Sequence, residues 1–461
     1  MPLQPLSLER LSAALAFVLV ATLACLIPVQ NDTWWHMAAG RDMAASGRVA
    51  LTETWSHTAA GGHWANYEWL TQVLFYGLYR AGGLPLLTLV CASAVVGAYA
   101  CVWRLMAGPD LARALMLVSA LSASTIVWAV RPQVLTLFLV GLTALLVARR
   151  RFAWLPPLFV VWANLHGAVA LGGVLLVAAL AAAAWTERRL VWPLAVTATL
   201  CFGAGFLTPL GWRYWLEIGV SLSRSRANQI IEWQPPQLPP AHLVFWIGLA
   251  ALAVLSVVNR RGLARFDFAF PVCAAGLLGL LALRSQRNVP VFLLLAMPAV
   301  SGLAFGAHDG RRERDIEPWR SRLHWGALAL TALGAVWFVA TQWRAVPSPL
   351  GWTPMSRDAA AAIRDCPPPI YNAYNDGGFI VWFVPEQKVF LDSRQDPYPV
   401  ALVQAHVQAE RTGTYEPLFA RYGIRCAVFA SDSAGLARLT ARGWLAHYRD
   451  AQWTVLVRSS P

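Results

Sequence analysis

The chain has 461 residues, of which 57% are hydrophobic and only 13% are charged, and its mean hydropathy is +0.49. Soluble domains carry about a quarter charged residues, so the composition excludes a wholly water-soluble protein and indicates an integral membrane protein. The net charge of +13 does not predict a nucleic-acid partner, because the basic residues lie in short clusters between apolar segments, as in the loops of membrane proteins.

Eleven apolar segments follow one another along the first three quarters of the chain. A membrane-spanning helix needs about 20 apolar residues, and the predicted spans are 11–30, 84–104, 111–129, 132–148, 153–166, 168–186, 190–208, 242–258, 266–283, 288–306 and 323–342. The first span lacks a cleavage site followed by a polar mature start, so we interpret it as an uncleaved signal anchor. The sequence therefore predicts a polytopic α-helical membrane domain over 1–343 with about eleven helices.

The basic clusters predict the orientation of these helices. If the N-terminus is cytoplasmic, every dense cluster falls in a cytoplasmic loop, as the positive-inside rule requires. The clusters are Arg149, Arg150 and Arg151; Arg188 and Arg189; Arg260, Arg261 and Arg265; and Arg311, Arg312, Arg314, Arg320 and Arg322. We therefore expect a multi-pass membrane protein whose long loop 31–83, with juxtamembrane helices, lies outside the cytoplasm.

The segment 344–461 has the polar composition of a water-soluble domain. Strand-like stretches ("PIYNAY", "QKVFLD", "RCAVFA") alternate with helical ones, and "WLAHYRD" with "WTVLVRS" predicts a closing hairpin. This pattern predicts a small α/β domain, which the orientation places on the periplasmic or extracellular side. Cys366 and Cys426 share this domain, and they can pair if it faces an oxidising space; the sequence leaves that open.

The first outer loop carries unusual polar residues at the membrane boundary, in "NDTWWHMAAGRDM". Asp32 and His36 are four residues apart and share a face if the segment is helical, and Glu68 follows in an amphipathic stretch. A carboxylate here can act as a general base towards an acceptor, or it can bind a divalent cation such as Mg²⁺ or Mn²⁺. The tryptophans around these residues, such as Trp34 and Trp35, are typical of an interfacial belt.

Three arginines lie at the predicted outer ends of helices, against the positive-inside trend: Arg131, Arg284 and Arg287. Guanidinium groups bind phosphate in a bidentate manner, so these arginines predict a phosphate or diphosphate ligand. The alternative is that they pair with Asp32, Glu68 or Glu232.

Three further polar residues belong to the predicted outer face. His166 is either a proton carrier or a hydrogen-bonded core histidine, and Glu232 lies in a proline-rich loop that can act as a gate. Arg394, after a predicted strand, is a candidate substrate contact or part of a solvated salt bridge. Because ionisable groups at membrane depth generally face a cavity, we expect a polar cavity that opens to the outside.

The sequence resembles the bacterial polytopic membrane proteins of the GT-C glycosyltransferase superfamily. The resemblance rests on "DTWWHMAAG", "GHWANYEWLTQVLFYGLYRAGG", "WANLHGA", "TPLGWRYW", "IIEWQPP", "RSQRNVPVF", "YNAYNDGGFIVW" and "VFLDSRQDPY", so it covers most of the chain. It implies a GT-C-like membrane domain and an acidic catalytic residue in the first outer loop, a position that Asp32 matches. Many members have two adjacent acids there, whereas Thr33 follows Asp32 in this chain.

The resemblance implies a lipid-linked sugar transferase. A polyprenyl-phosphate sugar in the membrane would be the donor, the arginines would hold its phosphate, and Asp32 would be the base, supported by His36 and Glu68. The identity of the sugar and of the glycan, lipid or protein acceptor stays open, as does the metal. Two alternatives remain: a transporter or flippase that binds lipid-linked substrates, and a degenerate GT-C scaffold with a role in assembly.

Overall fold

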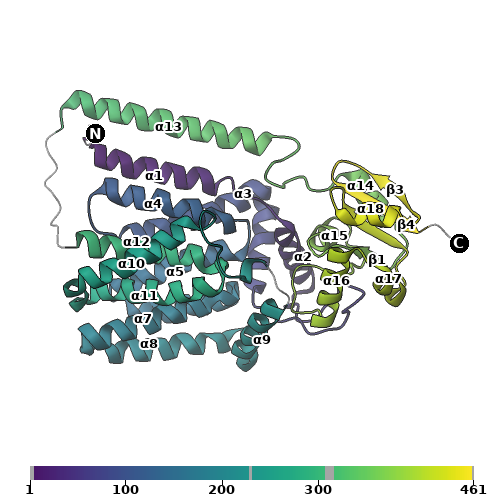
Figure 1. Ribbon diagram of the computed structural model, residues 1–461, viewed down its shortest axis with the longest axis horizontal. Coiled ribbons are helices and arrows are strands. Elements are labelled where there is room, and N and C mark those ends of the chain that lie inside the picture. Colours follow the sequence, from purple (N-terminus) through teal and green to yellow (C-terminus); the bar gives the residue numbers. More distant parts are fainter. Residues whose placement is uncertain (1–4, 228–230, 307–315, 459–461) are drawn as a thin grey trace. The chain divides into compact units, whose positions relative to one another are not determined.

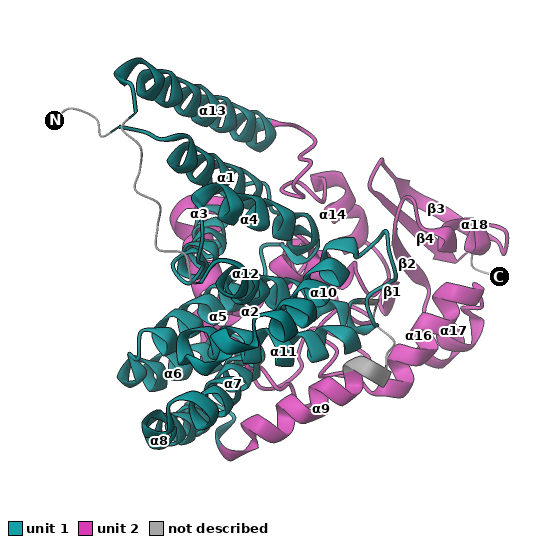
Figure 2. Ribbon diagram, turned by 60° about the vertical axis from the view of Figure 1, so that its left-hand side comes forward, with its two compact units in different colours: residues 1–27, 88–211, 231–344 teal, residues 28–87, 212–230, 345–461 magenta. Residues whose placement is uncertain are grey.

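The computed structural model describes residues 5–227, 231–306 and 316–458 (Figure 1). Three arginines of the last predicted basic cluster, Arg311, Arg312 and Arg314, lie outside these residues. The chain forms two compact units (Figure 2). The first unit comprises 1–27, 88–211 and 231–344, and the second comprises 28–87, 212–230 and 345–461.

The first unit is a helical bundle, and each of the eleven predicted spans coincides with a helix in the structure. These helices are α1 (Leu8–Ala24), the second part of α3 (Trp69–Trp103), α4 (Asp110–Ser124), α5 (Pro132–Ala148), α6 (Leu155–Leu165), α7 (Ala170–Thr186), α8 (Val191–Gly203), α10 (Leu243–Val258), α11 (Phe266–Arg284), α12 (Val289–Phe305) and α13 (Pro318–Arg344). Among the described residues, seven helices are long and apolar enough to cross a membrane, and three shorter helices are also apolar.

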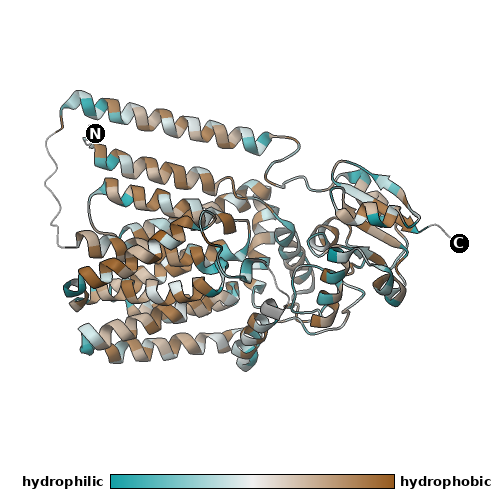
Figure 3. Cartoon of the chain, viewed as in Figure 1, coloured by the Kyte–Doolittle hydropathy of each residue, from teal (hydrophilic) through white to brown (hydrophobic). Residues whose placement is uncertain are grey.

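Hydrophobic residues predominate along the helices of this bundle (Figure 3), and many of the large ones are exposed. On α13, for example, Leu330, Leu333 and Trp337 are about 70% exposed (74%, 69% and 69%). Extended apolar surfaces of this kind are unfavourable in water and are typical of helices surrounded by lipid. The chain is therefore a multi-pass membrane protein.

The basic loops of the first unit lie together at one end of the bundle. Arg150, after α5, pairs with Glu187 after α7 at 2.9 Å and with Asp267 at the start of α11 at 3.7 Å. Three loops that the sequence predicts to be cytoplasmic are thus linked. The packing agrees with a common side for these loops, while the direction of the bundle in the membrane stays a prediction.

The second unit begins with α2 (Asn31–Ser46), which continues into a loop and the first part of α3. α3 is interrupted at Gly82 and Gly83, where Gly83 has a φ of 65°, a conformation that glycine adopts without steric cost. The interruption separates the predicted amphipathic stretch from the predicted span at 84–104. The helix α9 (Tyr214–Ala227) also belongs to this unit.

A four-stranded sheet forms the core of the C-terminal part of this unit, in the order β1-β2-β4-β3. β1 (Ile370–Asn372) pairs in parallel with β2 (Cys426–Ala430), while β4 (Trp453–Arg458) pairs antiparallel with β2 and with β3 (Trp444–Arg449). The helices around it are α14 (Arg357–Arg364), α15 (Gly377–Phe383), α16 (Val400–Thr412), α17 (Glu416–Tyr422) and α18 (Ala434–Thr440). The predicted α/β domain and its closing hairpin are confirmed.

Successive residues of β1 point to opposite faces of the sheet, and each face has its own apolar cluster. Ile370 packs with α14 and α15, whereas Tyr371 packs with α16 and α17. A disulfide joins Cys366, after α14, to Cys426 at the start of β2. The covalent bond therefore links the first helix of the domain to its central strands.

The prediction of a strand at "QKVFLD" is wrong. This segment forms one isolated bridge, between Val389 and Ser56, because side chains occupy its other backbone groups. Asn372 accepts a hydrogen bond from the N–H of Phe390 and donates one to the carbonyl of Leu391. One amide side chain thus takes the place of a neighbouring strand.

Candidate functional site

Asp32 lies in the first turn of α2, whose start is defined by a capping box between Gln30 and Thr33. The Asp32 Oδ1 atom accepts hydrogen bonds from the Ser393 hydroxyl, from Trp35 Nε1 at 3.3 Å and from Asn31 Nδ2 at 3.4 Å. The unpaired N–H groups of a first helical turn also favour a negative charge. The carboxylate therefore has a defined orientation.

His36 and Glu68 form a second pair in the same unit. His36 is on α2, as the spacing from Asp32 predicts, and its Nε2 atom lies 3.8 Å from Glu68 Oε2. The imidazole is buried and contacts the Trp35 ring, with centroids 3.6 Å apart and the ring planes tilted by 34°. The structure thus brings His36 and Glu68 together, and their catalytic roles stay predictions.

Three tryptophans of this region are not part of an interfacial belt. Trp34, Trp35 and Trp64 are at most 5% exposed. Trp34 packs against Phe383 of α15 with ring centroids 4.8 Å apart. The belt interpretation is therefore wrong for these three residues, because they fill the interior of the second unit.

Arg394 lies in a buried ionic cluster. Its guanidinium bonds Asp392 through Nε at 2.8 Å and through NH2 at 2.6 Å, and it also pairs with Glu53. The rings of Trp55 and Trp64 cover the guanidinium, with centroids 4.1 and 4.5 Å away. Only 1% of this side chain is exposed, so its contacts hold protein segments together; the predicted role in substrate binding stays a prediction.

The turn after Arg394 also contacts the first loop. Tyr67, next to Glu68 in the chain, donates a hydrogen bond to Asp396 Oδ2 at 2.8 Å, and Arg224 of α9 donates to the Asp396 carbonyl. Burial raises the pKa of Asp396 to about 6, and the Tyr67 hydrogen bond opposes this shift. Gln395, between Arg394 and Asp396 in the chain, has a φ of 65°, a strained value for a residue with a side chain.

A basic cluster lies in the first unit. Arg131, the N-cap of α5, approaches Glu232 Oε1 at 3.5 Å, and Arg287 approaches Glu232 Oε2 at 3.7 Å. With the Gln133 amide turned to satisfy its neighbours, its oxygen accepts from Arg287 at 2.7 Å and from Arg131 at 3.1 Å. Arg287 also lies over the Trp233 ring at 5.2 Å. Two of the three predicted arginines thus converge on one half-exposed carboxylate.

This cluster and the basic loops lie at opposite ends of α5. Arg131 caps the N-terminus of α5 and Arg149 its C-terminus. The 17 residues of the helix separate these caps by about 25 Å. The bundle therefore keeps its phosphate-binding candidates apart from its basic loops.

The other predicted residues of the first unit lie outside the basic cluster. His166 is buried, and its Nδ1 atom is hydrogen-bonded to Thr136 Oγ1 at 2.7 Å; that hydroxyl also accepts from Trp162 Nε1 at 3.0 Å. Arg284, the last residue of α11, is exposed. The predicted site residues therefore form an acidic group (Asp32, His36 and Glu68) in one unit and a basic group (Arg131, Arg287 and Glu232) in the other.

Sequence reasoning missed three residues of these groups: Glu53, Gln133 and Ser393. Each contacts a predicted residue, but the partner of Glu53 and that of Ser393 are more than 300 positions away in the chain. Gln133 stands two residues after Arg131, so its proximity was the one available signal.

Within the described part of the chain, no three histidine, cysteine or acidic side chains are arranged to hold a metal ion. The described groups at this position that could bind a metal ion are the Asp32 carboxylate, the Ser393 hydroxyl and the Asn31 amide. A role for a divalent cation stays a prediction, and no chemical step below depends on it.

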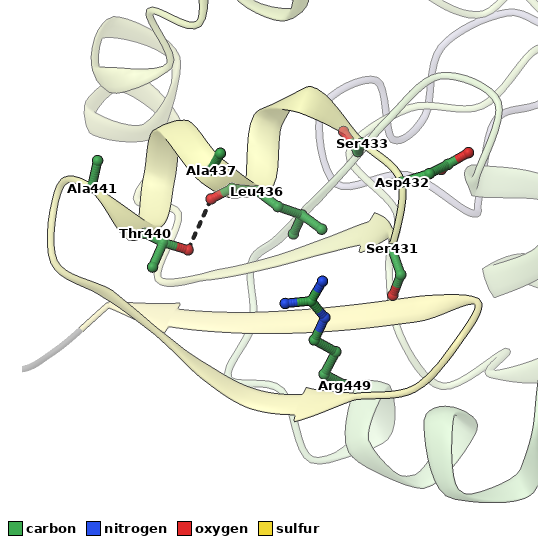
Figure 4. Close-up of a pocket in the computed structure, with 8 residues that line it drawn as sticks. All are labelled: Ser431, Asp432, Ser433, Leu436, Ala437, Thr440, Ala441 and Arg449. Atoms are coloured by element: carbon green, nitrogen blue, oxygen red, sulfur yellow. Dashed lines mark hydrogen bonds between the residues drawn. The ribbon is translucent and has the colours of Figure 1, made fainter.

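A hollow of about 450 Å³ lies on the C-terminal domain (Figure 4). Its lining includes Ser431 and Asp432 after β2, Leu436 and Thr440 of α18, and Arg449 of β3. The Thr440 hydroxyl donates a hydrogen bond to the carbonyl of Leu436. None of the predicted site residues lines this hollow.

The helical bundle with an acid-bearing first loop and a C-terminal α/β domain has the fold of the GT-C membrane glycosyltransferases. The archaeal oligosaccharyltransferase AglB from Archaeoglobus fulgidus, in complex with an inhibitory peptide and a dolichol-phosphate, matches with a TM-score of 0.55 and 11% identity over 90% of this chain and 69% of that chain. The apo form of the Archaeoglobus fulgidus oligosaccharyltransferase matches with 0.52 and 10% over the same shares.

ArnT from Cupriavidus metallidurans in the apo state matches over 96% of both chains, with a TM-score of 0.51 and 15% identity. The chain matches no protein-family model and no curated protein sequence. At these identities the likeness shows the fold, and the predicted GT-C fold class is confirmed.

Proposed function

We propose that the protein is a glycosyltransferase that moves a sugar from a polyprenyl-phosphate-linked donor to an acceptor at the extracytoplasmic face of the membrane. The observation that carries the proposal is the placement of Asp32 in a GT-C fold, at the start of a helix and oriented by three hydrogen-bond donors. The dolichol-phosphate in the AglB complex supports a lipid phosphate as the carrier in this fold.

Asp32 acts as the general base. It accepts the proton of an acceptor hydroxyl or amine as the oxygen or nitrogen of that group bonds to the anomeric carbon of the sugar. The bond between the anomeric carbon and the phosphate oxygen breaks, and the lipid phosphate leaves with the bonding electrons. Attack opposite the leaving group inverts the anomeric configuration.

Arg131 and Arg287 hold the phosphate of the donor. Their separations from Glu232, 3.5 and 3.7 Å, exceed the 2.7–2.9 Å or so of strong charge-assisted hydrogen bonds. The two arginines and one carboxylate leave a net positive charge, so a phosphate that binds both guanidinium groups more closely can displace Glu232. Gln133 orients the two guanidinium groups from the other side.

The C-terminal domain faces the extracytoplasmic space, and the N-terminus lies in the cytoplasm. The Cys366–Cys426 disulfide supports this orientation, because disulfides persist in oxidising compartments. The five free cysteines all belong to the helical bundle. The clustering of the basic loops at one end of the bundle supports the same orientation.

The test compares the full-length protein with the Asp32→Asn variant in native membranes. Radiolabelled polyprenyl-phosphate sugars of several kinds are added, and transfer of the label to membrane or glycan fractions is measured. We expect Asp32→Asn to lower transfer by at least about 100-fold, as for the loss of a general base. Asp358→Asn is the matched control, because Asp358 is an exposed acid in the first turn of α14 in the same unit.

The outcomes separate the alternatives. Lipid phosphate binding without transfer in the wild type supports a transporter or flippase, and the absence of both supports a scaffold. Transfer that continues unchanged in Asp32→Asn contradicts the assignment of the base. Analysis of lipids and glycans in a strain lacking the gene identifies the donor that accumulates and the product that is lost.

A further inference from the structure

Ser393, on the turn that follows the irregular segment 387–392, contacts the candidate base. Its hydroxyl oxygen accepts hydrogen bonds from Asn31 Nδ2 at 2.7 Å and from Trp35 Nε1 at 3.1 Å. Both neighbours are N–H donors, so the single hydroxyl proton is left for the third neighbour, Asp32 Oδ1, to which Ser393 donates. The direction of this hydrogen bond therefore follows from the donors around it.

The backbone of Ser393 is itself held in place. Tyr374 donates a hydrogen bond to the Ser393 carbonyl at 2.9 Å. On either side, Asp392 and Arg394 belong to the buried cluster with Glu53. A serine with both flanking side chains buried has little freedom to move, so its hydroxyl is a fixed donor.

A second contact from the C-terminal domain holds the same turn of α2. The N–H of Gly378, in the first turn of α15, donates to Asn31 Oδ1 at 2.6 Å. A Cβ atom at position 378 would lie 2.4 Å from two oxygens of Asn31, so glycine permits this close approach. Asn31 thus receives one hydrogen bond from α15 and donates another to Ser393.

We propose that Ser393 is a positioning residue for Asp32, through which the C-terminal α/β domain orients the base. The inference rests on the proposed function, since it assigns a second residue to the same site. The hydroxyl holds Oδ1 in one orientation and stabilises the ionised carboxylate that proton acceptance requires. The C-terminal domain then contributes directly to the reaction.

The experiment uses the full-length protein in lipid nanodiscs, with the radiolabelled polyprenyl-phosphate sugar that the wild type transfers best. We expect Ser393→Ala to lower kcat about 10- to 100-fold, the effect of losing a hydrogen bond to a charged group, and to leave the KM for the donor nearly unchanged. Ser393→Thr retains a hydroxyl and should restore most of kcat. Ser356→Ala removes another serine hydroxyl of the same domain, at the N-cap of α14, and should leave kcat unchanged.

A second measurement does not depend on activity. Water-soluble carbodiimide couples an amine to a carboxyl group, and mass spectrometry quantifies the product at Asp32. We expect coupling at Asp32 to be faster in Ser393→Ala, because the hydroxyl that occupies Oδ1 is gone, and close to the wild-type rate in the Ser393→Thr and Ser356→Ala variants.

Unchanged coupling at Asp32 in Ser393→Ala would overturn the inference, as would equal losses of kcat in the alanine and threonine variants. If the wild type transfers no sugar while coupling at Asp32 still depends on the Ser393 hydroxyl, the proposed function fails and the contact between Ser393 and Asp32 stands.

Discussion

The buried ionic cluster around Arg394 gives a strong prediction about stability. Arg394→Ala removes the cation that pairs with both Glu53 and Asp392, whose side chains are fully buried. Two carboxylates then remain close together without their partner, and the Trp55 and Trp64 rings lose the guanidinium between them.

The expected loss is about 3 kcal/mol in the free energy of local unfolding. Breaking a buried ion pair by removing one partner costs about 3–5 kcal/mol. We expect the lower end, because other donors remain: Glu53 Oε1 accepts from the N–H groups of Trp55 and Ser56, each at 2.6 Å, and Asp392 accepts from the Tyr398 hydroxyl at 2.8 Å.

Hydrogen exchange of the full-length protein in nanodiscs measures this loss at peptides that contain Trp55 and Ser56. A loss of about 3 kcal/mol corresponds to exchange that is roughly 100-fold faster. Arg364→Ala is the matched control, because Arg364 pairs with Glu386 at 3.6 Å and both side chains are about half exposed (47% and 59%). Such pairs contribute about 0–1 kcal/mol, so exchange near Arg364 should rise less than about fivefold.

A similar, small effect of both substitutions would refute the reasoning that the buried cluster stabilises this region. Combining Arg394→Met with Glu53→Gln should recover part of the protection, because it removes a buried charge of each sign. If hydrogen exchange in the double variant is as fast as in Arg394→Ala, the loss of stability comes from lost packing between the two tryptophans and not from lost charge balance.

Three further predictions concern other parts of the molecule. Maleimide should label Cys366 and Cys426 only after reduction, and labelling without a reductant would contradict the disulfide. Reduction of this disulfide, which spans 60 positions, should destabilise the second unit by about 4 kcal/mol. Burial, with the nearby Glu410, raises the pKa of Asp376 to about 7 from 3.8, so the folded state holds this proton more tightly than the unfolded state does. The stabilising contribution of the proton is complete below about pH 4 and is lost as the pH rises through 7. Asp376→Asn should flatten that part of the pH dependence of hydrogen exchange. Glu232→Gln should bind fluorescent undecaprenyl phosphate roughly fivefold more tightly than the wild type, because it removes a competing charge, and weaker binding would show that Glu232 does not compete with phosphate.

The helices and most strands were predictable because their signals are local. Each of the eleven segments is predominantly apolar, and a chain in lipid satisfies its backbone groups by forming a helix. The α/β domain shows alternating strand and helix patterns. The failure at "QKVFLD" has a physical reason that no local pattern contains. Its apolar residues are buried as in a strand, but the Asn372 side chain, from β1, satisfies its backbone.

The candidate site was predictable in part. A carboxylate at the start of a helix, an imidazole four residues later and arginines at helix ends are visible in the sequence, and the structure brings His36 to Glu68 and Arg131 to Glu232. Their long-range partners are not visible, since nothing near Glu53 indicates an arginine 341 positions later in the chain. For the same reason, Trp34 resembles a residue of a membrane belt until its burial against α15 is known.

The packing of the second unit shows that the C-terminal domain and the first loop form one structure. A soluble domain after the last span can be a separate appendage, and then its loss would leave the first loop intact. Here Ala38 of α2 belongs to the apolar cluster of α14, α15 and the sheet, and Arg394 completes an ionic cluster with Glu53. The first loop therefore shares part of its core with the C-terminal domain, in addition to its own apolar cluster around Trp35 and Trp64. Since Asp32 lies on that loop and accepts a hydrogen bond from Ser393, the orientation of its carboxylate depends on the folded C-terminal domain.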